Sequence, residues 1–495
     1  MKHLYTTKPI HLLLEQADEK EKGLKRTLSA LNLVALGVGG IIGAGIFMRT
    51  AAAAANNAGP AVTIGFIIAA IGCALAGLCY AEFASMIPVA GSAYTYSYAT
   101  MGELVAWIIG WDLVLEYALG AATVAIAWSQ YLNKLLGFMG IHIPYQWCHS
   151  PFEPLRDAGG NIVTHAYMNI PAVIILLLVT ILLIRGTRES AFVNGIIVIV
   201  KVSIVMAFIT LGWSFIDPAN HTPYIPAASI YTDLQGIPHN FGGITGILGA
   251  AGVVFFAFIG FDAVSTAAQE AKDPKRDMPI GILGSLAACT LIYILFSHVL
   301  TGVASVEDFR TQGREASVAY AIETYMHGYG WLAKSVTLAI LAGFSSVILV
   351  LLWGQSRVFY SMSKDGLVPK MFSDIHPKYR TPHKSNWLFL IFVGLFAAFV
   401  PGDIVGDMTS IGTLFAFILV CAGIIVMRKT QPNTPRGFKT PWVPVVPIAG
   451  IVVCLSMIYG LGYPNWIRLG IWMLIGFVIY FTYSYKHSKL HPHNQ

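Results

Sequence analysis

The sequence predicts an all-α integral membrane protein with twelve transmembrane helices, and three observations support this fold class. The chain has 495 residues, of which 56% are hydrophobic and only 11% are charged, and its mean hydropathy is +0.66. A soluble domain carries about 25% charged residues. The apolar residues gather in long segments, and Lys and Arg are distributed unevenly between these segments. A soluble fold of this length could not bury so much apolar surface, so we expect a lipid bilayer around the chain.

Twelve segments are long and apolar enough to cross a bilayer, because a hydrocarbon core of about 30 Å requires about 20 apolar residues in a helix. Their approximate bounds are 31–50, 61–86, 103–133, 168–185, 190–216, 242–268, 279–304, 332–362, 386–401, 405–427, 442–462 and 466–485. Two long connections, 134–167 and 217–241, are predicted outside the membrane.

The basic residues indicate the orientation of these spans. With the N-terminus in the cytoplasm, the inner segments hold 23 of the 31 Lys and Arg residues, the outer segments hold seven, and Lys201 lies within a span. This asymmetry agrees with the positive-inside rule. We therefore expect the chain in the plasma membrane, with both termini in the cytoplasm.

Composition and motifs argue against several other classes. The net charge of +6 is dispersed among the segments between spans, so we expect no nucleic-acid partner. Five of the six cysteines lie in apolar spans without metal-ligand spacing, which predicts buried free thiols and no metal site. The sequence shows no Walker A motif, zinc motif or nucleophile elbow, so we expect neither an enzyme nor a cofactor. Nothing in the sequence predicts an oligomeric state.

The first span contains an unusual run of glycines. In the stretch GVGGIIGAGIFMRT, residues 37–50, five of the first nine residues are Gly, and each Gly in a helix interior costs roughly 0.5–1 kcal/mol relative to Ala. One interpretation is a close helix–helix packing face, with Gly39 and Gly43 four residues apart. We favour a break in the helix, because the other three glycines point elsewhere. Non-helical backbone at membrane depth occurs where it lines a cavity or is buried in protein.

The sixth span contains a second irregularity. In FFAFIGFDAVSTAAQE, residues 255–270, Asp262 lies close to Gly260 within the span. Paired interruptions at corresponding positions of two repeats, here spans 1–5 and 6–10, point to a transporter site at the repeat interface. Freed N–H groups around residues 43–45 would bind a carboxylate, and freed carbonyls near residues 256–259 would bind an ammonium. A zwitterionic α-amino acid carries both groups, so the sequence predicts an amino acid site.

Three ionisable residues within the spans carry further hypotheses. Lys201 is central in the fifth span, where desolvation disfavours its charged form, and we interpret it as a proton-carrying group; snorkelling and a static ion pair are the alternatives. Glu116 follows Asp112 by one turn in the third span. It would contact the side chain of a cationic substrate, or it would be a structural carboxylate buried between helices. We interpret Asp262 as structural, either capping the broken helix or pairing nearby.

Several stretches of the chain resemble the bacterial branch of the cationic amino acid transporter family, within the amino acid–polyamine–organocation superfamily. They read GVGGIIGAGIF, CYAEFASMIPVAGSAYTYSYATMGELVAWIIGWDLVLEY, FFAFIGFDAVSTAAQEAKDPKRDMPIGI, GQSRVFYSMSKDGLVP and IGTLFAFILVCAGIIVMRKTQP. The resemblance implies a LeuT-like fold with two inverted five-helix repeats, broken helices 1 and 6, and two extra helices. The expected division is a cytoplasmic segment 1–30, repeats at 31–217 and 242–427, helices 11 and 12 within 442–485, and a cytoplasmic tail 486–495.

The resemblance also implies a set of residues that bind the substrate. The carboxylate contacts would fall on Ile41, Ala44 and Gly45. The amine contacts would fall on the carbonyls of Phe256, Ala257 and Ile259, with Phe256 as a lid over the substrate. Some bacterial relatives carry Thr where Ala44 stands, so a hydroxyl contact is missing here.

Further residues are implied in specificity and coupling. Glu116 matches a glutamate near the side-chain end of the substrate. Lys201 matches a lysine that takes the place of a sodium ion in proton-coupled relatives, and Ser345 and Ser346 would accept its hydrogen bonds.

Together these observations predict a secondary active permease for amino acids that works by alternating access and is coupled to protons. Family members with the same motifs transport cationic or small neutral amino acids, so the resemblance leaves the substrate open. A sodium-coupled or exchange-type transporter is the first alternative. A membrane sensor that binds amino acids without transport is the second, and the short tails without a signalling domain argue against it.

Overall fold

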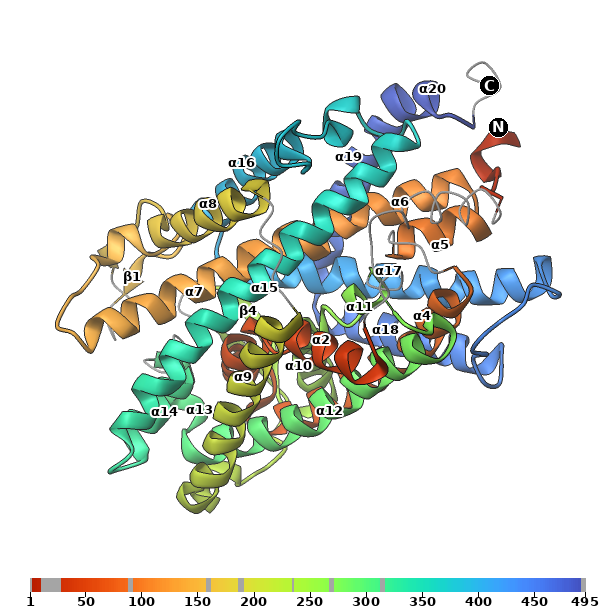
Figure 1. Cartoon of the computed structure of the whole chain (residues 1–495). Coiled ribbons are helices and arrows are strands. Elements are labelled where there is room, and N and C mark those ends of the chain that lie inside the picture. Colours follow the sequence, from red (N-terminus) through yellow and green to blue (C-terminus); the bar gives the residue numbers. More distant parts are fainter. Residues whose placement is uncertain are drawn as a thin grey trace.

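The computed structural model describes residues 2–9, 28–87, 92–156, 162–185, 191–233, 236–266, 271–311 and 317–490. Within these ranges the chain forms a bundle of long helices, most of which run roughly parallel or antiparallel to one another (Figure 1). Much of the predicted cytoplasmic segment 1–30 and the last five residues of the predicted tail lie outside the described residues.

The first half of the chain forms helices in each of the first five predicted spans. The first two spans and the link between them contain α2 (Ala30–Ile41), η2 (Gly45–Arg49), α3 (Thr50–Ala53), η3 (Ala54–Ala58), η4 (Gly59–Ala61) and α4 (Val62–Met86). The longer helices that follow in this half are α5 (Ser92–Thr100), α6 (Glu103–Val114), η5 (Leu115–Leu119), α7 (Gly120–Gly137), α8 (Ile170–Arg185) and α9 (Ala191–Gly212). Four short 3-10 helices complete it: η1 (Lys2–Tyr5), η6 (Tyr145–Trp147), η7 (Trp213–Phe215) and η8 (Pro218–His221).

The second half forms helices in the other seven predicted spans. These are α10 (Gly243–Phe255), η9 (Phe256–Phe258), α11 (Ala263–Thr266), α12 (Pro274–Val303), α15 (Gly330–Lys364), α16 (His383–Phe399), α17 (Gly402–Thr430), α18 (Val445–Gly460), α19 (Tyr463–Ile479), η12 (Tyr480–Ser484) and α20 (Tyr485–His487). Two short helices, α13 (Val306–Thr311) and α14 (Ser317–Tyr325), lie between α12 and α15.

The lengths and compositions of these helices suit a multi-pass membrane protein. Within the described residues, seven helical stretches are long and apolar enough to cross a bilayer, and five apolar helices are shorter. The shorter ones include α2 and the α10–η9 stretch, which are the first parts of spans one and six. The total of twelve spans stays a prediction, because helix length and apolar composition alone do not define a crossing.

The long helices pack in two groups. In one group, α12 lies against α2 and α4, and α10 lies against α4. In the other, α15 lies against α7 and α8, and α16 lies against α8. Helix α9 touches both groups through α2 and α15, and α17 touches them through α4 and α7. The broken spans one and six therefore belong to the same packing group.

Two small hairpins are exceptions to the all-helical prediction. Strand β1 (Leu155–Arg156) pairs with β2 (Ile162–Thr164), and β3 (Ser229–Thr232) pairs with β4 (Pro238–Phe241). Both hairpins lie in the two long connections that were predicted outside the membrane. Backbone groups there can be satisfied by strand pairing, whereas an open sheet edge would not be tolerated in lipid.

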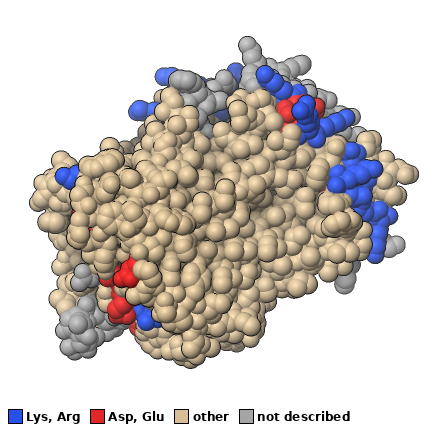
Figure 2. All heavy atoms as spheres, turned by 90° about the horizontal axis from the view of Figure 1, so that it is seen from below, with Lys and Arg blue, Asp and Glu red and all other residues tan. Residues whose placement is uncertain are grey.

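The two ends of the bundle differ in charge. Figure 2 shows a broad uncharged area in the middle of one face, with Lys and Arg mainly toward its right-hand and upper edges. The N-terminal and C-terminal segments meet at the basic end, because Lys8 forms an ion pair with Asp365 and the backbone N–H of Lys489 donates to the Asp365 carbonyl. This arrangement places both terminal segments on one side of the bundle.

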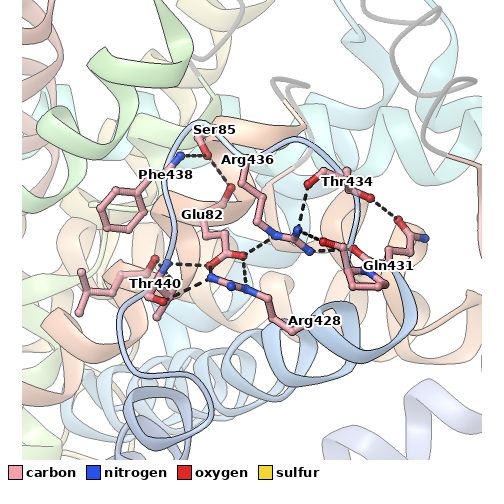
Figure 3. Close-up of polar contacts among 10 residues, drawn as sticks. Glu82, Ser85, Arg428, Gln431, Thr434, Arg436, Phe438 and Thr440 are labelled. Carbon is pink, nitrogen blue, oxygen red and sulfur yellow. Dashed lines mark hydrogen bonds and ion pairs between the residues drawn. The ribbon is translucent and has the colours of Figure 1, made fainter.

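A buried acidic residue at the basic end fixes the connection between α17 and α18. The Glu82 carboxylate, on α4, accepts hydrogen bonds from Arg428 at 2.8 and 2.9 Å, from Arg436 at 3.0 Å and from the backbone N–H of Thr440 at 2.8 Å (Figure 3). Ser85 adds a contact, because its hydroxyl accepts from the Phe438 N–H. One carboxylate therefore ties α4 to the end of α17 and to the following loop.

We expect Glu82→Gln to destabilise the fold by about 3 kcal/mol, because an amide removes the charge that faces two guanidinium groups and leaves Arg436 buried without its ion pair. Thermal unfolding in detergent measures the effect. Lys384→Gln is the control, because the Lys384–Asp374 pair is exposed and its loss leaves the melting temperature unchanged. Equal melting temperatures for the two variants would contradict the expectation.

Candidate functional site

The first span is interrupted where the glycine-rich stretch predicts a break. Helix α2 ends at Ile41, Ile42 adopts an extended conformation with φ −72° and ψ 98°, and helical backbone resumes at Ala44. The last carbonyls of α2 and the first N–H groups after the break are therefore without the partners that a continuous helix would give them.

The sixth span is interrupted as well. Helix α10 continues into the 3-10 turn η9, which ends at Phe258, and Ile259 is extended with ψ 133°. Gly260 has φ +112°, a conformation that L-residues with a side chain rarely adopt. Helical backbone resumes at Ala263.

The two interruptions lie against each other through glycines. A Cβ atom added to Gly45 would come within 2.1 Å of the Ala257 Cα, and one added to Gly260 would come within 2.9 Å of the Gly40 carbonyl oxygen. The glycine run therefore has both of the features considered from the sequence, a break in the helix and close packing against neighbours. The helix breaks, and the glycines also let four different neighbours approach from different directions: Ser285, Gly260, Val347 and Ala257.

Tyr293 joins the two interruptions, and the sequence analysis did not identify it. Its hydroxyl, on α12, lies 2.9 Å from the carbonyl oxygens of both Ile41 and Ala257 and is buried. The ring packs against Phe66 and Phe258. In the sequence Tyr293 is one aromatic residue within an apolar span, so only the fold reveals its two carbonyl partners.

A small cavity lies between the two interruptions. Its lining consists of glycine and apolar side chains: Gly40, Ile41, Gly43, Ala44, Gly45, Val124, Phe256, Ile259, Val347 and Leu351. Five of the seven residues predicted to bind the substrate are in this set, and Phe256 is among them. Ala257 lies behind the wall, packed on Gly45, and Glu116 does not line the cavity.

The side chain of Lys201, which belongs to α9, reaches the C-terminal end of α2. Its ammonium group donates to the carbonyl oxygens of Gly39 at 3.1 Å and Ile42 at 3.3 Å, and the residue is only 4% exposed. The aliphatic part of the side chain lies over Gly343, where a Cβ would come within 2.6 Å of the Lys201 Cε. A cation at this position is favoured by the partial negative charge at a helix C-terminus.

The two serines predicted beside Lys201 lie on α15, close to Gly343. The Ser345 hydroxyl donates to the Leu341 carbonyl at 2.9 Å and accepts from the Trp128 indole at 3.1 Å. Ser346 is buried. A hydrogen bond from Lys201 to either hydroxyl stays a prediction.

Glu116 and Asp262 occupy a separate buried region. The strongest electrostatic neighbours of the Glu116 carboxyl group are Asp262 and Asp112, and Glu116 is only 1% exposed. The Tyr117 hydroxyl donates to the Asp262 carboxylate at 2.5 Å. This pairing fits the structural interpretation of Asp262, whereas a contact between Glu116 and a substrate side chain stays a prediction.

Comparison with known proteins identifies the family. A family model described as "Amino acid permease" matches residues 28–484. The chain belongs to this family. The branched-chain amino acid permease BcaP of Bacillus subtilis is 44% identical over 96% of both chains. The methylthioribose transporter of the same organism is 40% identical over 99% of this chain and all of the relative.

The predicted resemblance to cationic amino acid transporters is confirmed by a more distant relative. Cationic amino acid transporter 4, vacuolar, of Arabidopsis thaliana is 32% identical over 86% of this permease and 66% of the relative. The relatives are named permeases or transporters, which agrees with the prediction of a non-enzymatic membrane protein.

A second feature that the sequence analysis missed lies beyond the cavity, on the second part of span one. Arg49 is 1% exposed and forms ion pairs with Asp403 and Asp407 of α17. Asp407 also accepts a hydrogen bond from Asn465. The predicted first span, 31–50, contains Arg49, but its two carboxylate partners are more than 350 residues away in the chain.

We expect Gly45→Ala to abolish uptake of amino acids by this permease, because the new methyl group would collide with the Ala257 backbone and force the two interruptions apart. Uptake into proteoliposomes, normalised to the amount of folded protein, measures the effect. Gly394→Ala is the matched control, because a Cβ there meets nothing within 4 Å. Normal uptake by the Gly45 variant would show that the close approach is dispensable.

Proposed function

We propose that this permease is a secondary active transporter that moves amino acids across the plasma membrane by alternating access, with both termini in the cytoplasm. The observation that carries the proposal is the cavity between the two helix interruptions, because it brings together five residues predicted to bind an amino acid. The position of both terminal segments at the basic end of the bundle supports the orientation.

The backbone around the cavity offers a group for each charge of a zwitterion. The N–H groups of Ala44 and Gly45 head the second helical part of span one, where a carboxylate is favoured. The carbonyls of Phe256, Ala257 and Ile259 lie at the end of η9 and would receive the ammonium group. Phe256 lines the cavity and would cover the bound substrate.

The packing of the long helices supports a LeuT-like arrangement with twelve spans. Spans one, two, six and seven correspond to the group around α4 and α12, and spans three, four, eight and nine correspond to the group around α15 and α7. Alternating access would be a relative movement of these two groups around the cavity. Helices α9 and α17 contact both groups and would follow that movement.

The cavity wall favours an aliphatic substrate side chain. Val124, Val347 and Leu351 come from α7 and α15 and offer only hydrocarbon surface. Glu116, the predicted partner of a cationic side chain, is outside the lining. We therefore propose that aliphatic amino acids are preferred, and the name of the 44% identical branched-chain permease points to the same class.

We expect leucine, isoleucine and valine to stabilise the purified permease in a thermal-shift screen of all amino acids and methylthioribose. Leu351→Ala should weaken this binding by about tenfold or more, since lost hydrocarbon contacts in a pocket are worth about 1–3 kcal/mol. Leu395→Ala, at an exposed position of α16, is the control. Selective binding of arginine and lysine that Glu116→Gln removes would instead assign the side-chain contact to Glu116.

Lys201 is the proposed proton-coupling group. Protonation keeps a charged donor on the Gly39 and Ile42 carbonyls, and deprotonation weakens that link between α9 and the broken span. A proton that binds one conformation more tightly than the other shifts the equilibrium between them. Ser345 and Ser346 would hold Lys201 in the conformation in which it releases α2.

Lys201→Met should remove uptake driven by a pH gradient, acid outside, while exchange of labelled for unlabelled substrate continues. Lys334→Met, at an exposed position of α15, should leave both activities intact. Gradient-driven accumulation by the Lys201 variant would refute the role of Lys201. A requirement for sodium in the wild type would favour the sodium-coupled alternative.

A further inference from the structure

A cluster of three carboxyl groups lies buried in the bundle, outside the cavity. Asp112 is on α6, Glu116 is on η5, and Asp262 is in the interruption of span six. All three residues are 0–1% exposed. The cluster therefore connects span three, from one packing group, to the broken span six, from the other.

Two residues of this cluster, Asp112 and Glu116, have poorly satisfied carboxyl oxygens. Within the described residues, neither oxygen of Asp112 and neither oxygen of Glu116 has a hydrogen-bond partner. The Glu116 carboxyl interacts most strongly with Asp262, then with Asp112 and with the Thr413 hydroxyl. No ion pair joins Asp112 or Glu116 to a basic side chain in the part of the chain that the structure describes.

An independent observation comes from Tyr80 on α4. Its hydroxyl is completely buried, has no hydrogen-bond partner among the described residues, and interacts electrostatically with Asp262 and Glu116. In the described part of the chain, the other titratable groups that interact electrostatically with the cluster are Tyr96 of α5, Tyr117 of η5 and Cys73 of α4. Every one of these groups is neutral at physiological pH in its ordinary state.

Three ionised carboxylates are not compatible with this environment. Each buried charge carries a large desolvation cost. Two carboxyl groups that share a site also repel each other when both are ionised, which adds a further cost. A carboxylic acid on Glu116 removes one charge and supplies an O–H group that a neighbouring carboxylate can accept, which satisfies an oxygen of Glu116. The environment of the cluster therefore favours a state in which at least one carboxyl group carries a proton.

We propose that Glu116 and Asp262, with Asp112 beside them, form a proton-binding site that is separate from Lys201. The site holds a proton between the two carboxyl groups in the conformation seen here. A change in the span-six interruption alters the distance between them, so proton binding is linked to the conformation of that span. The proposal does not depend on the role of Lys201 or on the identity of the substrate.

Infrared spectroscopy of the whole purified protein tests the proposal directly, because protonated carboxyl groups have a C=O band distinct from that of carboxylates. At pH 7 the wild type should show this band, and Glu116→Gln should lose part of it. The amide imitates a neutral carboxyl group, so the variant should keep the wild-type melting temperature. Asp374→Asn, which removes an exposed carboxylate bound to Lys384, should leave the band unchanged.

A second variant and a test of sodium binding complete the experiment. Asp112→Asn should also reduce the band, which keeps the proposal testable if Glu116→Gln does not fold. A band that neither variant reduces overturns the proposal. Replacing choline chloride with sodium chloride should not change the melting temperature; a stabilisation by sodium that Glu116→Gln removes would assign the site to a metal cation and overturn the proposal as well.

Discussion

The structure depends on how the carbonyl groups at the end of α2 are satisfied. A helix that stops in the membrane leaves its last four carbonyls without intrahelical partners, and no water is available in the hydrocarbon region to replace them. Lys201 donates to the carbonyls of Gly39 and Ile42, and Tyr293 donates to that of Ile41. Without these two side chains the interruption would leave several buried polar groups unpaired, each at a cost of several kcal/mol. Lys201 comes from α9 and Tyr293 from α12, so two further spans are fixed in position by the break in the first.

The glycines then determine where the second interruption lies. Gly45 and Ala257 approach so closely that no side chain fits between them, and Gly40 and Gly260 do the same on the other side of the break. Tyr293 reinforces this arrangement, because the same hydroxyl also reaches the Ala257 carbonyl. The cavity is what remains between two backbones held at this distance. Its walls are completed by side chains of α7 and α15, the helices of the other packing group.

Much of this site could be predicted from the sequence, because its main signals are local. Glycines in an apolar span indicate a break, and a lysine at the middle of another span must find polar partners. The direction of Glu116 could not be predicted, because η5 is a π-helix, whose extra residue per turn rotates the following side chains relative to an ordinary helix. The roles of Tyr293 and Arg49 could not be predicted for a related reason. The groups that they contact are distant in sequence, and only the packing of the spans brings them together. The hairpins in the two long connections gave no strong alternating pattern and could not be predicted either.

The peptide groups at the break connect the basic residue to the cavity. Every side chain in the cavity wall is apolar, so the charges of a bound zwitterion would meet backbone groups alone. The Ile42 carbonyl, which accepts from Lys201, belongs to the same planar peptide group as the N–H of Gly43, a residue of the cavity wall. A change in the hydrogen bond of Lys201 would therefore act on a peptide group whose other edge lies at the cavity. In the proposed mechanism the same broken backbone would bind the substrate and respond to the charge of Lys201, so no further side chain would be needed between the two sites.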